Sequence, residues 1–335
     1  MRAIVGALAV SMAAGALTAE VPAGRPPGLE LTGNLSRVHD PTIIHVDGHY
    51  FVFATGQARD ETGLVPVRVS SDLLNWELRG AVFPDIPAWA AEHVPGTRGI
   101  WAPDISHRNG EYRLYYSIST FGRNRSAIGL TVNTSLDPQA PGTGWTDRGP
   151  VIESHSSDNF NAIDPNAFDD ADGRQWLVFG SFWSGIKMVR LDPATGMRSS
   201  EDQRIYALAS RRRPGAVEAP FIIRHDNYYY LFASFDFCCR GVESTYYTVV
   251  GRSRDPTGPY VDRDDRAMME GGGFLVLHAD LDPTRRFVGP GHSAILQDGG
   301  RDYIVYHAYD RQADGAPTLR IQPLGWTEDG WPVAI

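Results

Sequence analysis

The feature that most constrains the fold is a segment layout that occurs five times along the chain. Each copy has a polar or aromatic first residue, a short apolar run, a tight turn and a second apolar run. The copies read HDPTIIHVDGHYFVFATG, WAPDISHRNGEYRLYYSIS, IDPNAFDDADGRQWLVFGSF, VEAPFIIRHDNYYYLFASF and GHSAILQDGGRDYIVYHAY. A period of about 50 to 60 residues with several strands per repeat is typical of propeller blades. We therefore predict an all-β chain folded as a five-bladed β-propeller.

Turn dipeptides and aromatic pairs support a hairpin in every repeat. The turns contain Asp47-Gly48, Asn109-Gly110, Asp172-Gly173, Asp226-Asn227 and Gly299-Gly300. Such residues supply the positive φ angles that two-residue hairpin turns need. The second strands carry aromatic residues three apart, namely Tyr50/Phe53, Tyr112/Tyr115, Trp176/Phe179, Tyr229/Phe232 and Tyr303/Tyr306. Residues three apart in a strand point to opposite faces, so each second strand should be packed on both sides. A β-sandwich is the structural alternative, but it does not explain five aligned segments.

The first residue of each repeat stands eight or nine residues before the turn. These residues are Asp40, Trp101, Asp164, Glu218 and His292. Equivalent positions on the innermost strands of a propeller form a ring, so we expect the five side chains to converge at one end of the central channel. Each carboxylate alone could be a turn residue with local hydrogen bonds. Three carboxylates in one ring instead indicate a site, because a protonated acid and an ionised base can together hydrolyse a glycosidic bond. A third carboxylate can hold the acid protonated.

Seven segments of the sequence resemble glycoside hydrolase family 43, in particular its endo-1,5-α-L-arabinanases. They are VHDPTI, WAPDIS, STFGRNRSAIGL, NAIDPN, GSFWSGI, FASFDFCCRG and GPGHSAI. The resemblance covers nearly the whole chain after Gly33 and implies one catalytic propeller domain at residues 33–335. In VEAP an alanine follows Glu218, where this branch of the family favours glycine. The extra methyl group should not remove the chemistry.

The resemblance implies an inverting mechanism with three acidic residues. Asp40 matches the general base that activates water, and Glu218 matches the general acid that protonates the leaving oxygen. Asp164 matches the residue that adjusts the pKa of this acid and orients it. For inversion we expect the carboxyl groups of Asp40 and Glu218 to lie about 6.5 to 9.5 Å apart, whereas about 5 Å would indicate retention.

The resemblance also implies a metal ligand and several substrate contacts. His292 matches a ligand of a calcium ion in the central channel, with waters as most of the other ligands. Trp101 and Phe121 match aromatic groups that line the arabinose subsites, and Asn166 and Ser181 are further candidates for substrate contact. The alternatives are a hydrogen-bonded core histidine at position 292 and ordinary blade packing at Trp101.

The expected function is hydrolysis of α-1,5-L-arabinofuranosidic bonds in arabinan or arabino-oligosaccharides, by a monomer that cleaves within the chain. An α-L-arabinofuranosidase or β-xylosidase of the same family would share the three acids. A non-catalytic glycan-binding propeller is a competing hypothesis from another class of protein. Cleavage by a hydrolase would depend on Glu218, whereas binding alone would not.

The composition excludes some partners and predicts export. A net charge of −9 argues against a nucleic-acid partner, and the one basic run, Arg211-Arg212-Arg213, is interpreted as a solvated loop. Residues 1–19 match a secretory signal peptide, and no other segment is long and apolar enough to span a bilayer. We therefore expect an extracellular or periplasmic protein. The adjacent Cys238 and Cys239 could form a vicinal disulfide or stay as buried thiols.

Overall fold

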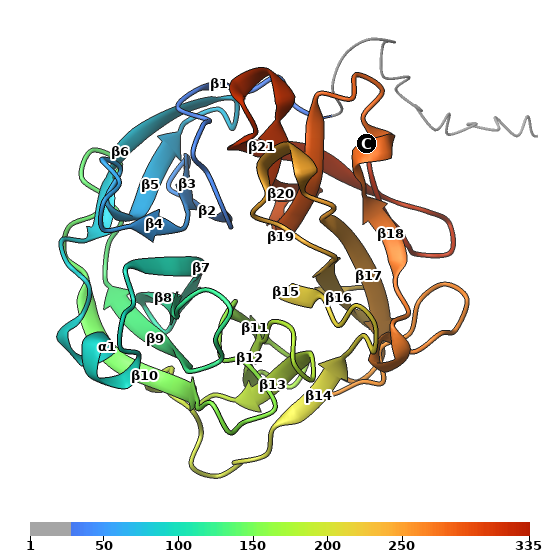
Figure 1. The fold of residues 1–335 in the computed structure, drawn as a ribbon, viewed down its shortest axis with the longest axis horizontal. Helices are drawn as coiled ribbons and strands as arrows, with labels where there is room; N and C mark the ends of the chain where they lie inside the picture. The colour runs from blue at the N-terminus through green and yellow to red at the C-terminus, as the bar shows by residue number, and fades with distance from the viewer. Residues whose placement is uncertain (1–27) are drawn as a thin grey trace, which may run out of the picture.

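The structure is a computed structural model, and it describes residues 28–335. The predicted signal peptide at residues 1–19 lies outside the described residues. Within them the chain forms five sheets around a central axis, so the prediction of an all-β, five-bladed propeller is confirmed. Figure 1 shows β2, β7, β11, β15 and β19 nearest to this axis. No helix in the described part of the chain is long and apolar enough to cross a membrane.

Each blade is an antiparallel meander of four main strands. Blade 1 contains β2 (Thr42–Val46), β3 (His49–Phe53), β5 (Leu64–Ser70) and β6 (Asn75–Phe83). Blade 2 contains β7 (Gly99–Arg108), β8 (Glu111–Ile118), β9 (Ser126–Asn133) and β10 (Thr146–Ser154). Blade 3 contains β11 (Asn166–Asp169), β12 (Gln175–Phe179), β13 (Ile186–Arg190) and β14 (Tyr206–Ala209).

Blades 4 and 5 repeat this order. Blade 4 contains β15 (Val217–His225), β16 (Tyr228–Phe235), β17 (Tyr247–Ser253) and β18 (Phe274–Leu277). Blade 5 contains β19 (Phe287–Asp298), β20 (Arg301–Asp310), β21 (Ala316–Trp326) and β22 (Pro332–Ala334). The shorter elements are β1 (Thr32–Gly33), β4 (Gly56–Gln57), α1 (Ala88–His93), η1 (Gly241–Glu243), η2 (Met268–Glu270), η3 (Ala279–Leu281) and η4 (Arg311–Ala313).

The ring is closed by the segment that precedes β2. Strand β1 pairs in parallel with β6 of blade 1. The same segment is hydrogen-bonded to β21 of blade 5, where Leu29 donates to Ile321 and Leu319 donates to Leu35. Backbone pairing to both blades therefore links the beginning of the propeller to its end.

The hydrophobic core is divided among the five contacts between neighbouring blades. Each of the five buried apolar clusters combines residues of two adjacent blades. All five aromatic pairs on the second strands are split between two clusters; Tyr112, for example, lies between blades 1 and 2, and Tyr115 between blades 2 and 3. Packing on both faces of the second strands is therefore confirmed.

Four of the five predicted two-residue turns are present. The flanking pairs are Val46 with His49, Arg108 with Glu111, His225 with Tyr228 and Asp298 with Arg301. Blade 3 differs, because Asp169 pairs with Gln175 across a longer loop. In that loop the Asp170 carboxylate accepts the backbone N–H groups of Asp172 and Arg174. These bonds add to the backbone bond from Gly173 N–H to the Asp170 carbonyl at 3.0 Å and hold the longer loop in place.

Candidate active site

Each blade has a residue with positive φ just before, or within the first half of, its innermost strand. These residues are Asp40 (52°), Ala102 (42°), Asp164 (59°), Ala219 (54°) and His292 (50°). The expectation that Trp101 and Glu218 occupy the same position as the other three first residues is therefore wrong by one residue. The equivalent residues are Ala102 and Ala219, each eight residues before its turn. Asp164 is nine residues before its turn because the loop of blade 3 is longer, so a distance of nine also seemed to fit Trp101 and Glu218.

The positive-φ residues are held by side chains from the second strand of the preceding blade. The backbone N–H of Asp164 donates to Ser117 Oγ at 2.9 Å, and that of His292 donates to Ser234 Oγ at 2.9 Å. Blade 3 supplies Ser181 at the matching place, but its hydroxyl donates to Glu218 Oε2 at 2.7 Å. The structure thus gives Ser181 a contact with the candidate acid itself.

The structure brings Asp164 and Glu218 together through a backbone hydrogen bond between blades 3 and 4. The backbone N–H of Ala219, directly after Glu218, donates to Asp164 Oδ2 at 3.1 Å. Asp164 therefore takes the place that a hydroxyl group holds in other blades. This bond fixes the start of β15 and, with it, the backbone that carries Glu218.

The Asp40 carboxylate is surrounded by hydrogen-bond donors although it is buried. Oδ1 lies 2.8 Å from His39 Nδ1 and 2.9 Å from His292 Nδ1. Oδ2 accepts the Thr55 hydroxyl at 2.6 Å. Burial alone would raise the pKa of Asp40, but the charges and hydrogen bonds of His39 and His292 lower it well below the usual value. Asp40 is therefore ionised near neutral pH, as a general base must be.

The surroundings of Glu218 and Asp164 raise the pKa of both groups, whereas those of Asp40 lower its pKa. Burial raises the pKa of Glu218; the Ser181 and Tyr246 hydroxyls and the charge of His292 oppose this rise, and the charge of Asp40 adds to it. Burial also raises the pKa of Asp164, and the charges of Glu218 and Asp40 increase it further. The two acids therefore keep a proton to higher pH than free carboxylic acids do, as a proton donor requires.

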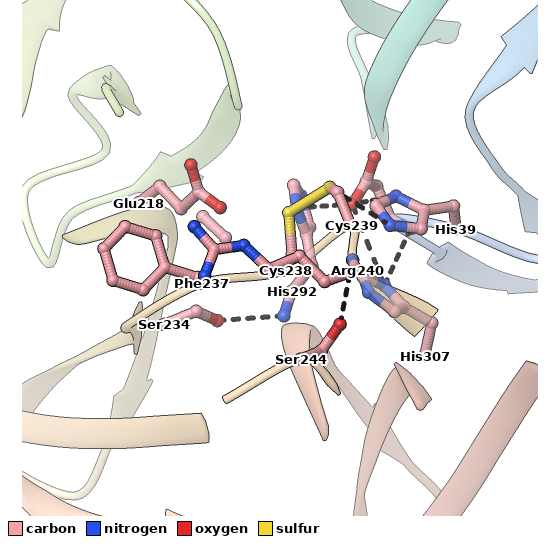
Figure 2. The surroundings of a disulfide bond; sticks show 12 residues. His39, Glu218, Ser234, Phe237, Cys238, Cys239, Arg240, Ser244, His292 and His307 are labelled. Carbon is pink, nitrogen blue, oxygen red and sulfur yellow. Dashed lines mark hydrogen bonds and ion pairs between the residues drawn. A yellow bond between two sulfur atoms is a disulfide. The ribbon is translucent and has the colours of Figure 1, made fainter. Parts of the chain in front are cut away.

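A chain of hydrogen bonds leads from Asp40 to a disulfide. His39 Nε2 lies 2.9 Å from the Tyr309 hydroxyl, which accepts the backbone N–H of Cys239 at 2.7 Å. Cys238 and Cys239 are joined as a vicinal disulfide, which answers the question that the sequence left open. Figure 2 shows this disulfide in the same region as Glu218, His292 and His39. Sequence reasoning missed His39, although it stands directly before Asp40 in VHDP.

The expected substrate contacts have different surroundings. Phe121 is 82% exposed, so its ring is available to a ligand. Trp101 is partly exposed, and its buried Nε1 has no hydrogen-bond partner among the described residues. Both side chains therefore remain candidates.

Substrate contact at Asn166 is not supported. Asn166 is only 3% exposed. Its Nδ2 donates to Asp104 Oδ1 at 3.1 Å, and its Oδ1 accepts the Ile222 N–H at 2.8 Å. The amide thus ties blades 2, 3 and 4 together. Asp104 also accepts the Ala167 N–H at 2.8 Å and so joins blade 2 to blade 3.

The fit of a cation to His292 depends on one ring nitrogen. Nδ1 faces Asp40, so Nε2 is the atom that could bind an ion. Within residues 28–335, no group of three His, Cys, Asp or Glu side chains suited to an ion includes His292. A metal there would need water as most of its other ligands, which a calcium ion accepts. Carboxylate contact at the other ring nitrogen is common among metal-binding histidines.

The site of this propeller combines one ionised carboxylate with two carboxylic acids of raised pKa. This combination is typical of a glycoside hydrolase. The family model described as Glycosyl hydrolases family 43 matches residues 35–332, and the chain belongs to this family. The resemblance in the sequence is thereby confirmed.

Relatives include proteins named for two modes of cleavage. The chain is 43% identical over 297 residues to "Extracellular endo-alpha-(1->5)-L-arabinanase 1" of Bacillus subtilis, covering 88% of this chain and 87% of the relative. It is 41% identical over 308 residues to "Extracellular exo-alpha-(1->5)-L-arabinofuranosidase ArbA" of Cellvibrio japonicus, covering 88% and 85%. Among solved structures, Cellvibrio cellulosa α-L-arabinanase complexed with arabinohexaose matches with a TM-score of 0.82 at 38% identity, over 90% of this chain and 96% of the other.

Proposed function

We propose that the chain hydrolyses α-1,5 bonds between L-arabinofuranosyl residues of arabinan, with inversion and within the polymer. The observation that carries the proposal is the opposite effect of the surroundings on Asp40 and Glu218, whose pKa values are lowered and raised respectively. Relatives named as α-1,5-arabinan-cleaving enzymes support the substrate. None of these names favours the β-xylosidase alternative.

In the proposed mechanism, Asp40 removes a proton from water as the water attacks the anomeric carbon. Glu218 gives its proton to the glycosidic oxygen, so the leaving sugar departs as a neutral alcohol. Asp164 holds the backbone next to Glu218 and disfavours early loss of that proton. The predicted spacing of about 6.5 to 9.5 Å between Asp40 and Glu218 leaves room for this water.

We further propose that His292 binds a calcium ion through Nε2, with water as the main remaining ligand. When bound, the ion would supply positive charge beside the reacting groups. The chain's own contribution is the orientation of the imidazole, which the contact of Nδ1 with Asp40 fixes. Export is supported by the word "Extracellular" in the names of both relatives. We propose a monomer, since one chain supplies all the residues named here.

A product time course on debranched arabinan tests the proposed activity. Internal cleavage gives a broad ladder of oligomers at early times, whereas end-on cleavage gives one dominant product. Because one relative is named exo-acting, the second outcome would change the mode but keep the substrate. Proton NMR of the first product distinguishes inversion from retention. Activity on xylan without activity on arabinan would overturn the proposal.

A further inference from the structure

A cleft rich in arginine lies on blades 3 and 4, and the proposed chemistry does not use it. It encloses about 950 Å³ and is lined by Arg211, Arg212, Arg213 and Arg266. Within the described part of the chain, Glu270 is the only carboxylate that lines it. This concentration of positive charge contrasts with the net charge of −9 of the whole chain.

Two loops bring the arginines together. The loop between β14 and β15 carries Arg211, and the loop before η2 carries Arg266. The backbone N–H of Ser210 donates to the Met268 carbonyl at 2.9 Å, which joins the loops. A Cβ atom on Gly271 would lie 3.6 Å from Arg266 Nη2 and 3.7 Å from Arg211 Cγ. The two side chains therefore lie close together around this glycine.

Arg211 is a fixed part of the cleft wall. Its Nη1 donates to Asp236 Oδ1 at 2.8 Å and to the Ala216 carbonyl at 2.9 Å. Its guanidinium group lies 4.3 Å from the centre of the Phe235 ring. These contacts order the beginning of the arginine run, so the run is not simply a solvated loop.

The other arginines keep their charge available to a ligand. Arg266 Nη2 donates to the backbone carbonyl of Glu270, which does not neutralise the guanidinium charge. Arg212 and Arg213 are exposed, and neither has a hydrogen-bond or ion-pair partner among residues 28–335. Guanidinium groups bind carboxylates through two parallel hydrogen bonds, so these groups suit an anionic ligand.

The cleft wall also contains apolar side chains. Tyr247 is partly exposed and Leu275 is 44% exposed, while Phe235 and Val249 are buried. Aromatic and aliphatic side chains with a few charged groups are typical of pockets that bind organic ligands rather than simple ions. We propose that this cleft binds an oligosaccharide of uronic acid residues. Tyr247 and Leu275 contact the sugar rings, and the arginines bind the carboxylates. Duplex nucleic acid is disfavoured because its charge is denser and this chain is acidic.

The cleft lies beside the candidate active site. Val217, next to Glu218, pairs with Phe235 of β16, and Phe235 pairs with Tyr247 of β17. Two strand spacings of about 4.8 Å each place Tyr247 about 10 Å from Val217. Binding of a uronate chain in the cleft would thus hold the enzyme at polysaccharides that contain both uronic acid segments and neutral segments. Binding there goes beyond the proposed hydrolysis and does not require it.

Binding to soluble polygalacturonate, measured by affinity electrophoresis or calorimetry without added calcium, tests this site. The double substitution Arg212→Ala and Arg213→Ala should weaken binding about ten-fold or more, because two charge-assisted contacts are lost. A matched control replaces Arg79 and Arg148, which are paired with Glu77 and Glu111 on blades 1 and 2. The control should bind like the unmodified chain.

Three further results separate this proposal from others. Fully methyl-esterified polygalacturonate should bind much more weakly, since its carboxylates are blocked. The proposal is overturned if both double variants bind alike, if the esterified polymer binds as tightly, or if inorganic phosphate or DNA competes better than oligogalacturonate. The Arg212/Arg213 variant should hydrolyse linear arabinan at the original rate, so failure of this site and failure of the proposed activity are distinguishable.

Discussion

His292 Nδ1 lies 2.9 Å from Asp40 Oδ1, the same oxygen that His39 Nδ1 approaches to 2.8 Å. Two imidazoles on one oxygen and a hydroxyl on the other favour the carboxylate form of Asp40. Glu218, by contrast, accepts hydrogen bonds from the Ser181 and Tyr246 hydroxyls, and its burial favours the neutral form. An inverting glycosidase needs this difference between its two acids.

Replacing Glu218 by Gln should separate catalysis from binding. The amide cannot give up a proton, so kcat on arabinan should fall about 10²- to 10⁴-fold, while arabino-oligosaccharides still bind. Initial rates and calorimetry measure the two effects. Glu270→Gln, on the same blade but in the arginine cleft, is the matched control and should keep full activity. Unchanged hydrolysis in Glu218→Gln would instead favour a glycan-binding propeller with another function.

Replacing Asp164 by Asn should change the pH dependence of kcat/KM. The active form of Glu218 is protonated, so activity is present below its raised pKa and is lost as pH rises through it. The pKa of Asp164 is itself raised to about 8, so the two acids titrate as a coupled pair, and the ionised Asp164 carboxylate disfavours ionisation of Glu218. Its removal should lower the pKa of Glu218, and the alkaline limb should move to lower pH. Asp172→Asn, in an exposed turn, should leave the profile in place. A limb that stays fixed or moves to higher pH contradicts the assigned role.

The sequence predicted the fold because its signals are local and repeated. Turn dipeptides and aromatic pairs act within a few residues, and five copies reinforce one another. The error of one residue at Trp101 and Glu218 came from counting back from turns of unequal length. A proline aligns four of the repeats better than the turn does. It follows directly after Asp40, Ala102, Asp164 and Ala219.

The contacts around the candidate site could not be read from the sequence. His39 and Tyr309 are 270 residues apart, and only ring closure brings them within 2.9 Å. The resemblance to the family made Asn166 a candidate for substrate contact. Its amide instead bonds to Asp104 of blade 2 and to the Ile222 N–H of blade 4, partners that lie 62 and 56 residues away in the sequence.

The vicinal disulfide should support the position of the base. The Cys239 N–H bonds to Tyr309, which contacts His39, which in turn holds Asp40. Replacing both Cys238 and Cys239 by Ser frees this loop. We expect kcat to fall about three- to ten-fold, as for loss of one hydrogen bond of about 1 kcal/mol, with little change in KM. A phosphine reductant should lower the rate of the unmodified enzyme similarly and leave the double variant unaffected. Equal sensitivity of both proteins to the reductant would show that its effect arises elsewhere.

The calcium proposal can be tested without measuring catalysis. A ligand that binds only the folded chain raises its stability by about 2.7 kcal/mol at roughly 100 times its Kd. The melting temperature of the unmodified chain should therefore rise when calcium replaces chelator. His292→Ala should remove this rise, although the substitution also removes a contact with Asp40 and lowers the starting stability. The difference between calcium and chelator isolates ion binding from that loss. His278→Ala, a histidine in the arginine cleft, should keep the full rise. An equal rise in all three proteins would locate the calcium away from His292 and leave that imidazole as a hydrogen-bond donor to the base.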